Sequence, residues 1–447
     1  MFGHNRAAML RGLRLILRFF QLAWLLTWGH FAYVFALLRR GRMSPLEKER
    51  LRGEHIASLL ERLGATYLKF GQILSTRPDL LGPGYIEALS RLQDRVKPER
   101  PEAIFALLDE ELGEKRARIV ELSETPIAAA SVAQVHKGKL DDGSVVAVKI
   151  QRPGIEERVE RDLALLRIFA NLTTISPTLR LLALPGAVER FGRAMEAQLD
   201  FRKEAENNLR FAKNLADLEG VEVPKLHPDL CTKRVLVMEF IEGVRATEPE
   251  KVGQNGRELA MRGLDAILTM VFRDAFVHAD LHPGNILLTH DGRVVLIDLG
   301  LVAEIDEDMR RPWIDTFMAL MARDGKGAAR LFYAYAPSVG VKDYASYERD
   351  VTDFFDVFHG KPLNELEGGQ VVAGMMNILR KHRVEVDPVY TVVHVAMVVA
   401  EGLGKQLAPE LDLIQLAGPR LMEAMVTCPP GRPPLREPPT LETAKAA

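Results

Sequence analysis

The chain has 447 residues, of which 47% are hydrophobic and 27% are charged, and its formal net charge is -2. This composition is that of an ordinary globular protein with room for two or three domains, and the charge excludes a general attraction to nucleic acid. The two cysteines, Cys231 and Cys428, lie far apart without a CxxC motif, so neither a zinc site nor a disulfide framework is indicated.

The N-terminal segment contains an uncharged run, Phe19 to Leu38, with arginines on both sides. A helix of this length roughly matches the ~30 Å hydrocarbon core of a bilayer. Its tryptophans suit a membrane interface, whereas the polar residues within the run weaken a spanning helix. Three interpretations stay open: a membrane-spanning helix, a basic helix lying in the interface, and a hydrophobic helix of a soluble domain. No small-residue cleavage site follows, which argues against a signal peptide.

The next segment has a helical pattern from Pro45 to about Thr76, which must end before Pro78. Within it lies the tetrapeptide Lys69-Phe70-Gly71-Gln72, where glycine costs roughly 1 kcal/mol relative to alanine. We therefore expect another part of the chain to pack closely against the backbone at Gly71. Residues 83–122 predict further helices.

A β pattern begins after the loop Ala128, Ala129, Ala130 and Ser131. A hairpin turn at 141–143 precedes the apolar strand Val145 to Ile150, which carries Lys149 near its end. This order is typical of the small lobe of a protein kinase, where such a lysine contacts the nucleotide phosphates. Alanine resists positive φ, so a loop of alanines in place of glycines should be stiffer and cover ATP differently.

A charged helical stretch, residues 198–207, offers Glu204 as the carboxylate partner of Lys149, although several carboxylates there compete for this role. The strand that follows at 235–243 would be the hinge between kinase lobes. Its residues Met238, Glu239 and Ile241 are the candidates for adenine contacts.

The loop from His278 to Asn285 is followed by two short apolar strands around an Asp-Gly turn, and then by Asp298-Leu299-Gly300. Such a hairpin presents Asp280, Asn285 and Asp298 at one rim. Two carboxylates and an amide oxygen form a hard-oxygen site that suits Mg²⁺, and their spacing matches the catalytic and metal loops of kinase-like folds. Helical patterns then continue to about residue 425, and six prolines between 429 and 439 predict a disordered tail.

With these motifs the chain resembles the UbiB family of atypical, protein-kinase-like proteins, also called the ABC-one or ADCK family, over about residues 53–420. The specific marks are Lys69 to Gln72 with Ser75 to Leu81 after it, and the alanine-rich loop continuing into Gln134-Val135-His136. The segments around Lys149, Leu199-Asp200-Phe201 and His278 to Asn285 complete the set.

The resemblance implies an α+β, bilobal protein-kinase-like fold with an N-terminal helical extension and an N-terminal membrane-associated helix. Domain limits follow at 1–44 for the hydrophobic segment, 45–125 for the extension, 126–245 and 246–426 for the two lobes, and 427–447 for the tail. Lys149 would hold the nucleotide phosphates and pair with Glu204. Asp280 takes the catalytic-loop position, and Asn285 and Asp298 would hold magnesium. The extension, with Lys69, Gly71 and Gln72, would fold over the nucleotide site.

The resemblance also implies an ATP-binding, Mg²⁺-dependent ATPase that supports isoprenoid quinone (ubiquinone) biosynthesis or lipid homeostasis. It would be membrane-associated with a cytoplasmic catalytic domain. Its partners would be ATP or ADP, a membrane lipid or quinone precursor, and quinone-biosynthesis enzymes. A nucleotide-binding pseudokinase scaffold and a small-molecule phosphotransferase are the alternatives, and protein phosphorylation is the least expected activity.

Three positions depart from the family pattern. Gln198 stands where the family often has the glutamate of a Glu-x-Asp motif ending here at Asp200, and an amide cannot form an ion pair. Leu299 replaces the commoner phenylalanine of the metal loop, which leaves the metal ligand unchanged. Some bacterial members of the family carry hydrophobic C-terminal segments, whereas the C-terminus here is polar and proline-rich. We therefore expect the membrane attachment at Phe19 to Leu38.

Overall fold

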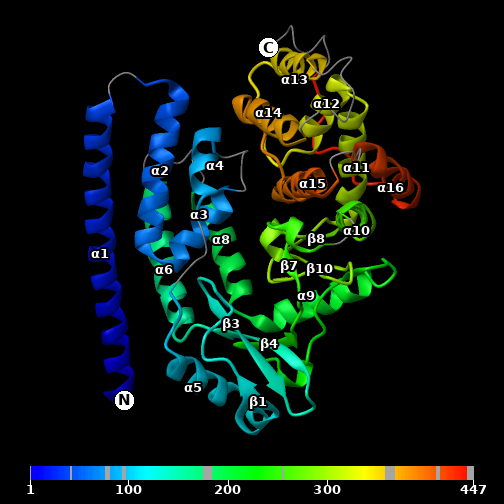
Figure 1. Ribbon diagram of the computed structural model, residues 1–447. Coiled ribbons are helices and arrows are strands. Elements are labelled where there is room, and N and C mark those ends of the chain that lie inside the picture. The colour runs from blue at the N-terminus through cyan, green and yellow to red at the C-terminus, as the bar shows by residue number, and fades with distance from the viewer. Residues whose placement is uncertain are drawn as a thin grey trace. The chain divides into compact units, whose positions relative to one another are not determined.

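The computed structural model describes residues 2–40, 43–75, 81–92, 97–174, 184–253, 256–357, 368–408 and 413–439. The chain forms two compact units (Figure 1). The first comprises Met1–Ser75, Leu81–Ala205 and Lys225–Phe240. The second comprises Thr76–Leu80, Glu206–Pro224 and Ile241–Ala447.

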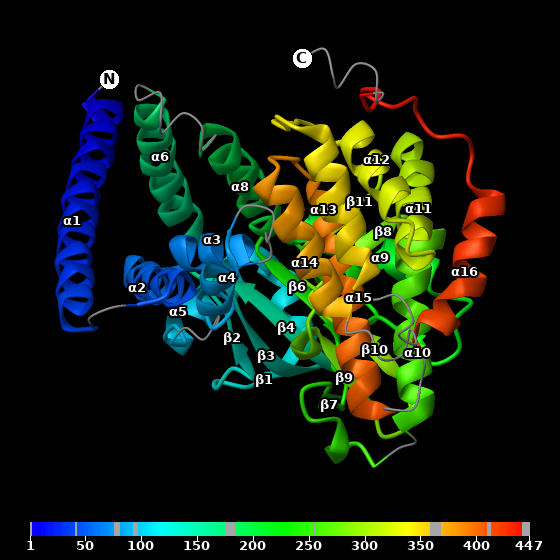
Figure 2. The ribbon, with the colours of Figure 1, turned by 90° about the horizontal axis from the view of Figure 1, so that it is seen from above.

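The first unit begins with four helices, α1 (Phe2–Arg40), α2 (Pro45–Leu63), α3 (Ala65–Ser75) and α4 (Pro83–Leu89). The single helix expected from Pro45 is two helices, because Gly64 adopts φ 105°, a conformation that ends a helix and that glycine adopts at little cost. The predicted stop near Thr76 lies outside the described residues. α1 lies beside α2 and α6 in both views (Figures 1 and 2).

Helices α2 and α4 cross at small residues. A Cβ on Gly53 would lie 2.7 Å from Ala88 Cβ and 3.1 Å from the carbonyl oxygen of Gly84. A Cβ on Gly71 of α3 would similarly lie 2.5 Å from a methyl group of Leu92 and 2.6 Å from one of Leu60. The close approach expected at Gly71 is therefore present, and leucine side chains provide it.

The first unit also holds a five-stranded sheet in the order β1-β3-β4-β6, with β2 paired to β3. Its strands are β1 (Ile119–Leu122), β2 (Ala128–Ala129), β3 (Ala133–Leu140), β4 (Val145–Gln151) and β6 (Val235–Glu239). Residues 119–122 are thus a strand, and the helical expectation there is wrong because they pair with β3. Helix α5 (Pro101–Leu112) packs on the sheet through Ile104 and Leu108, which are fully buried.

In the described residues between β4 and β5 there are three further helices. They are α6 (Ile155–Thr173), α8 (Leu184–Gln198) and α9 (Phe201–Asn214). The charged stretch 198–207 is interrupted between α8 and α9, and only the first turn of α9 belongs to the first unit.

The second unit contains two small sheets. One has the order β5-β10-β9-β7, made of β5 (Val221–Glu222), β10 (Val294–Leu296), β9 (Ile286–Leu288) and β7 (Val244–Arg245). The other pairs β8 (Phe276–His278) with β11 (Val302–Glu304). The expected hairpin at Asp291-Gly292 is present, since β9 and β10 are antiparallel and Gly292 has φ 86°.

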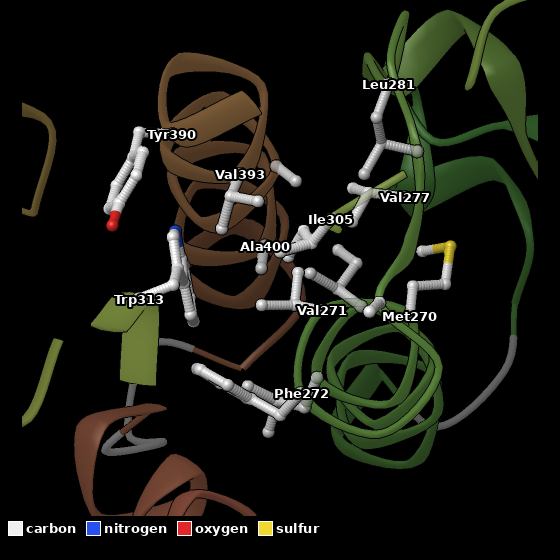
Figure 3. Packing of buried hydrophobic residues seen from close by; sticks show 14 of the residues in the cluster. Met270, Val271, Phe272, Val277, Leu281, Ile305, Trp313, Tyr390, Val393 and Ala400 are labelled. Atoms are coloured by element: carbon white, nitrogen blue, oxygen red, sulfur yellow. The ribbon is translucent and has the colours of Figure 1, made fainter. Parts of the chain in front are cut away.

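Most of the remaining described residues of the second unit are helical, in line with the sequence pattern. Its helices are α10 (Gly256–Leu268), α11 (Glu307–Met321), α12 (Gly325–Tyr335), α13 (Tyr344–Asp356), α14 (Gly368–Lys381), α15 (Pro388–Leu407) and α16 (Leu413–Thr427). A π-helical turn, Thr269–Arg273, extends α10 and places Val271 and Phe272 in the main core (Figure 3). The centroid of the Phe272 ring lies 5.2 Å from that of Trp313, which in turn contacts Tyr390.

The proline-rich segment after α16 makes hydrogen bonds with the second unit as far as Arg436. The Leu435 amide donates to the carbonyl of Ala334 at 2.9 Å, and the Arg432 amide donates to that of Asp308 at 2.8 Å. The disorder expected for the tail stays a prediction, although the backbone amides of Arg432 and Leu435 have partners in the second unit. Residues 440–447 lie outside the described part of the chain.

Within the described residues, one helical stretch, Ile16–Arg39, is long and apolar enough to cross a membrane. Only 6% of its most apolar window is buried.

Replacing Gly53 by alanine should destabilise the fold by about 1–3 kcal/mol, because the added methyl group overlaps Ala88 and the α4 backbone. Denaturant unfolding followed by circular dichroism measures this. Gly402→Ala in α15 is the matched control: no atom lies within 4 Å of its added methyl, and the better helix propensity of alanine should leave stability equal or higher. Equal stability of the two variants would contradict the tight α2–α4 crossing.

The buried His394 of α15 makes stability depend on pH. Burial lowers its pKa to about 4, although a hydrogen bond with the Tyr390 backbone opposes the shift. The unfolded chain binds the proton more readily, with a pKa of ~6.5, so this contribution is complete above pH ~6.5 and is lost as pH falls toward 4. His394→Leu should reduce the slope of the unfolding free energy against pH between these values, while the buried His136 and His278 keep their own contributions. An unchanged slope would exclude His394 as its source.

Candidate functional site

In the first unit, Lys149 and Glu204 form a nearly buried ion pair. Lys149 Nζ lies 2.8 Å from both carboxylate oxygens of Glu204, and the side chains are 12% and 7% exposed. Lys149 stands near the end of β4, opposite Val135 on β3 and Leu236 on β6. Removing one partner of such a pair leaves an uncompensated charge, typically at a cost of 3–5 kcal/mol.

The start of α9 fixes the position of Glu204. Asp200 accepts a hydrogen bond from the Arg202 amide at 3.2 Å, which satisfies a free N–H at the helix N-terminus. Asp200 also pairs with the Arg202 side chain at 2.6 Å, and these hydrogen bonds lower the pKa of its carboxyl. Phe201 is buried in a small cluster with Ala133 and Leu236. Gln198 ends α8 and lies two residues before this cap.

The alanine-rich loop is a tight β-hairpin. Ala128 pairs with Val135 and Ala129 with Gln134, and the Ala130 amide donates to the carbonyl of Ala133 at 2.8 Å. Its four residues 128–131 all have negative φ, so alanine is accommodated without strain. The amide of Ala130 is thus bonded within the hairpin, unlike the free amides of a glycine-rich phosphate loop.

Arg152, which the sequence analysis did not single out, clamps this hairpin. Its guanidinium donates to the carbonyls of Ala130 at 2.7 Å and Lys97 at 2.9 Å, and to the Glu99 carboxylate at 3.0 Å. The Arg152 amide also donates to the carbonyl of Val132 at 2.9 Å. The side chain is only 4% exposed. The signal in the sequence is its position in an Arg-Pro-Gly sequence three residues after Lys149.

A second row of buried polar groups continues from the clamp. Gln134 accepts a hydrogen bond from the Glu99 amide at 2.9 Å and donates one to His136 Nε2 at 2.8 Å. Because Nε2 accepts, the proton of the His136 ring is on Nδ1, which donates to the carbonyl of Ser123 at 2.6 Å. Burial lowers the pKa of His136, which agrees with this neutral form. The family mark Gln134-Val135-His136 is therefore a structural network under the hairpin.

The Lys69-Phe70-Gly71-Gln72 segment lies on α3 within the helical extension. Lys69 is buried, and Phe70 contacts Phe191 with ring centroids 4.9 Å apart. Gln72 donates to the carbonyl of Leu92 at 3.3 Å. Phe70 also shares a hydrophobic cluster with Val132, which directly follows the alanine-rich loop. The extension and the loop are thus neighbours within the first unit, while residues 76–80 of the longer motif lie outside the described residues.

The expected hinge follows β6. The Glu239 amide donates to the carbonyl of Lys225 at 2.7 Å, and the Phe240 amide donates to that of Val145 at 3.1 Å. Met238 pairs with Ala147 of β4. Ile241 is the first residue of this segment that belongs to the second unit, and adenine recognition by Met238, Glu239 and Ile241 stays a prediction.

In the second unit, His278 fixes the loop that carries Asp280. Its ring is buried between the Asp280 amide, which donates to Nδ1 at 3.2 Å, and the Ile297 carbonyl, which lies 3.3 Å from Nε2. Burial lowers the pKa of His278, so the ring is neutral with the proton on Nε2. Ile297 directly precedes Asp298, so this histidine links the two ends of the predicted metal site.

Asn285 is oriented by the same loop. Its side-chain amide donates to the carbonyl of Asp280 at 3.0 Å, which directs the other atom, Oδ1, away from that carbonyl. Its backbone is held at both ends, because its amide donates to the His282 carbonyl at 2.8 Å and its carbonyl accepts from the Ile297 amide at 2.9 Å.

Asp298 adopts a left-handed backbone conformation with φ 57°. Such conformations in non-glycine residues concentrate at functional sites, where the surrounding structure holds them in place. The next residue, Leu299, is buried in the main core, and its carbonyl accepts from the Asn207 side chain at 2.9 Å. Leucine therefore fills the packing position that follows Asp298.

These donors fit Mg²⁺ by their chemistry. Among the described residues, no group of three or more His, Cys, Asp or Glu side chains is arranged for a metal ion. Mg²⁺, however, is usually held by one or two carboxylates with substrate phosphates and water, so Asp298 with Asn285 would be a sufficient protein contribution.

Comparison with known proteins places the chain in a family. The family model described as an ABC1 atypical kinase-like domain matches residues 91–332, and the UbiB helical domain matches residues 351–412. A protein named "Probable protein kinase UbiB" from Shewanella halifaxensis is 33% identical over 405 residues, which cover 88% of this chain and 73% of that protein. A protein of the same name from Aeromonas salmonicida is 35% identical, covering 83% and 70%.

Among solved structures, the complex of Rv3197 with erythromycin from Mycobacterium tuberculosis is similar at a TM-score of 0.50 and 25% identity. It covers 76% of this chain and 90% of that chain. The expected protein-kinase-like α+β fold is confirmed by these matches. The chain belongs to the UbiB family of ABC1 atypical kinase-like proteins.

Proposed function

We propose that the chain binds ATP with Mg²⁺ and acts as an atypical kinase-like ATPase that supports isoprenoid quinone (ubiquinone) biosynthesis or lipid homeostasis at a membrane. The buried Lys149–Glu204 pair carries this proposal. An ion pair is costly to bury and gains little stability, so its retention at a strand end favours a functional role. The names of the relatives, "Probable protein kinase UbiB", support the kinase-like chemistry.

In this proposal Lys149 contacts the nucleotide phosphates, and Glu204 orients its ammonium group. The hairpin 128–131 covers the nucleotide. Met238, Glu239 and Ile241 contact the adenine. Asp280 orients the hydroxyl or water that accepts the phosphoryl group and takes up its proton.

Asn285 and Asp298 would hold Mg²⁺, which when bound neutralises charge on the phosphates. The left-handed conformation of Asp298 and the oriented amide of Asn285 support this assignment. Lys69, Gly71 and Gln72, together with Gln198 and Asp200, would form the regulatory extension that restricts access by protein substrates. The domain limits at residues 45, 126, 246 and 427 belong to the same proposal.

Asp298→Asn should abolish the Mg²⁺-dependent part of the thermal stabilisation by ATP and lower ATP hydrolysis by about 100-fold or more, because a metal ligand contributes several kcal/mol to charge stabilisation. Thermal shift with ATP, with and without Mg²⁺, and phosphate release measure the two effects. The control is Asp291→Asn, since Asp291 lies in the β9–β10 turn and pairs with Arg293 at the surface.

An identical Mg²⁺-dependent response of Asp298→Asn and the unmodified protein would refute the metal assignment. If the unmodified protein binds MgATP without turnover, the scaffold alternative holds instead.

Arg152→Lys should raise the KM for ATP roughly tenfold with a smaller change in kcat, because lysine keeps the charge but cannot make three directed hydrogen bonds. Steady-state kinetics well below the unfolding temperature measure this. Arg167→Lys is the control, since Arg167 forms an exposed ion pair with Glu189 in the same unit. A loss of stability with an unchanged KM would show that Arg152 serves the fold alone.

A further inference from the structure

Helix α1 has a face that packs against the rest of the first unit. Leu22 is buried in a cluster with residues of α2, α3, α4 and α6, and Leu25 packs on it. Gly29 approaches Leu59 of α2, and Tyr33 accepts a hydrogen bond from Arg52 of α2 at 2.8 Å. With Arg18, these residues recur every three or four positions and form one side of the helix.

The other side of α1 is apolar and exposed. Its residues are between 59% and 80% exposed, and they are Phe20, Trp24, Trp28, Phe31, Phe35 and Leu38. At 3.6 residues per turn, this stripe lies about 150° around the helix from the packed side and runs for about 27 Å. We call these six residues the aromatic stripe.

Two polar contacts fix α1 along its length. Arg18 Nε lies 2.9 Å from Asp162 of α6, and the two side chains are 17% and 7% exposed. About 22 Å further along the helix, Tyr33 contacts Arg52 and the ring of His55 on α2. α1 is thus tied at both ends of its apolar run to helices of the folded unit.

These contacts are incompatible with a spanning orientation. From Glu47 to Glu54, the part of α2 that approaches Tyr33, every residue except Leu51 and Gly53 is charged. Such a helix cannot enter hydrocarbon without a large desolvation cost. As long as α1 stays packed on α2, only its opposite side can meet lipid.

The charge of the N-terminal segment indicates what kind of surface binds the aromatic stripe. The segment from Met1 to Leu46 contains seven arginines and no acidic residue, although the whole chain has a net charge of -2. Arg39, at the end of the stripe, lies over the ring of Phe35 at 4.9 Å. A second copy of the chain would bring two such basic segments together, whereas an anionic bilayer attracts them.

We propose that α1 is an interfacial helix: it stays docked on α2 and α6 and inserts its aromatic stripe into the headgroup region of an anionic membrane. This deepens the membrane part of the proposed function and does not depend on nucleotide chemistry. Interfacial helices bind in this way through an apolar face and attraction of basic residues to anionic lipid.

The first test is flotation of the full chain with vesicles of phosphatidylcholine, with and without phosphatidylglycerol. The chain should bind the anionic vesicles, and Trp24→Gln with Trp28→Gln should lower the bound fraction about tenfold or more. The matched control is Val120→Gln with Val426→Gln, because both valines are exposed on other elements. Control binding should equal that of the unmodified protein.

The second test asks whether α1 stays docked on the membrane. Cysteines at Gly29 and Leu59, in a chain with Cys231→Ser and Cys428→Ala, should cross-link both in solution and on anionic vesicles, since a Cβ at 29 lies 3.6 Å from the Leu59 side chain. The pair Trp28→Cys with Leu59→Cys should not cross-link, because Trp28 lies on the exposed side.

Loss of the Gly29–Leu59 cross-link on vesicles would overturn the proposal in favour of a spanning helix. The proposal would also be overturned if the chain forms a stable dimer that does not bind vesicles, and if Trp24→Gln with Trp28→Gln dissociates this dimer. A second copy of the chain would then cover the aromatic stripe. The thermal shift on adding ATP should be the same for these variants and the unmodified protein, because the stripe is remote in sequence from every residue proposed to bind the nucleotide. This measurement separates a failure of the membrane proposal from a failure of the nucleotide proposal.

Discussion

The ion pair between Lys149 and Glu204 is the constraint around which the first unit is organised. It requires β4 to end beside the first turn of α9, and Asp200, Phe201 and the β6 strand hold that turn in place. Because both charges are nearly buried, neither residue can change without leaving the other uncompensated. The pair therefore fixes the direction of an ammonium group at a strand end, which supports the proposed contact of Lys149 with nucleotide phosphates.

The alanine-rich hairpin is held in place by a second buried charge, that of Arg152. A loop that binds phosphate through free amides needs glycine, because its backbone must turn and approach the ligand closely. Here the Ala130 amide donates to the carbonyl of Ala133 within the hairpin, and the Ala130 carbonyl accepts a hydrogen bond from the Arg152 side chain. The loop is thus positioned by side-chain contacts from outside it, which makes Arg152 as important to its geometry as the alanines themselves.

The sequence was informative where short-range chemistry decides the structure. Local patterns and the family resemblance predict the turn at Gly292 and the strand that carries Lys149. They also predict the loop that holds Asp280 and Asn285. Contacts between distant segments do not follow from local patterns. Ile119 to Leu122 form a strand because β3 lies beside them, and the Leu435 amide donates to the carbonyl of Ala334 about a hundred residues earlier. Arg152 was missed for the same reason, since its three acceptors come from distant segments.

Helix α1 shows why hydrophobicity alone left three interpretations open. Apolar residues occur on both of its sides, so the mean hydropathy of a sequence window cannot distinguish the side that packs on protein from the side that meets lipid. The distinction rests on two polar contacts, Arg18 with Asp162 and Tyr33 with Arg52, which lie on the same side of the helix. A helix held in this way would carry the folded unit at the membrane surface. Only the aromatic stripe of α1 would then enter the headgroup region, and the rest of the first unit would stay in water.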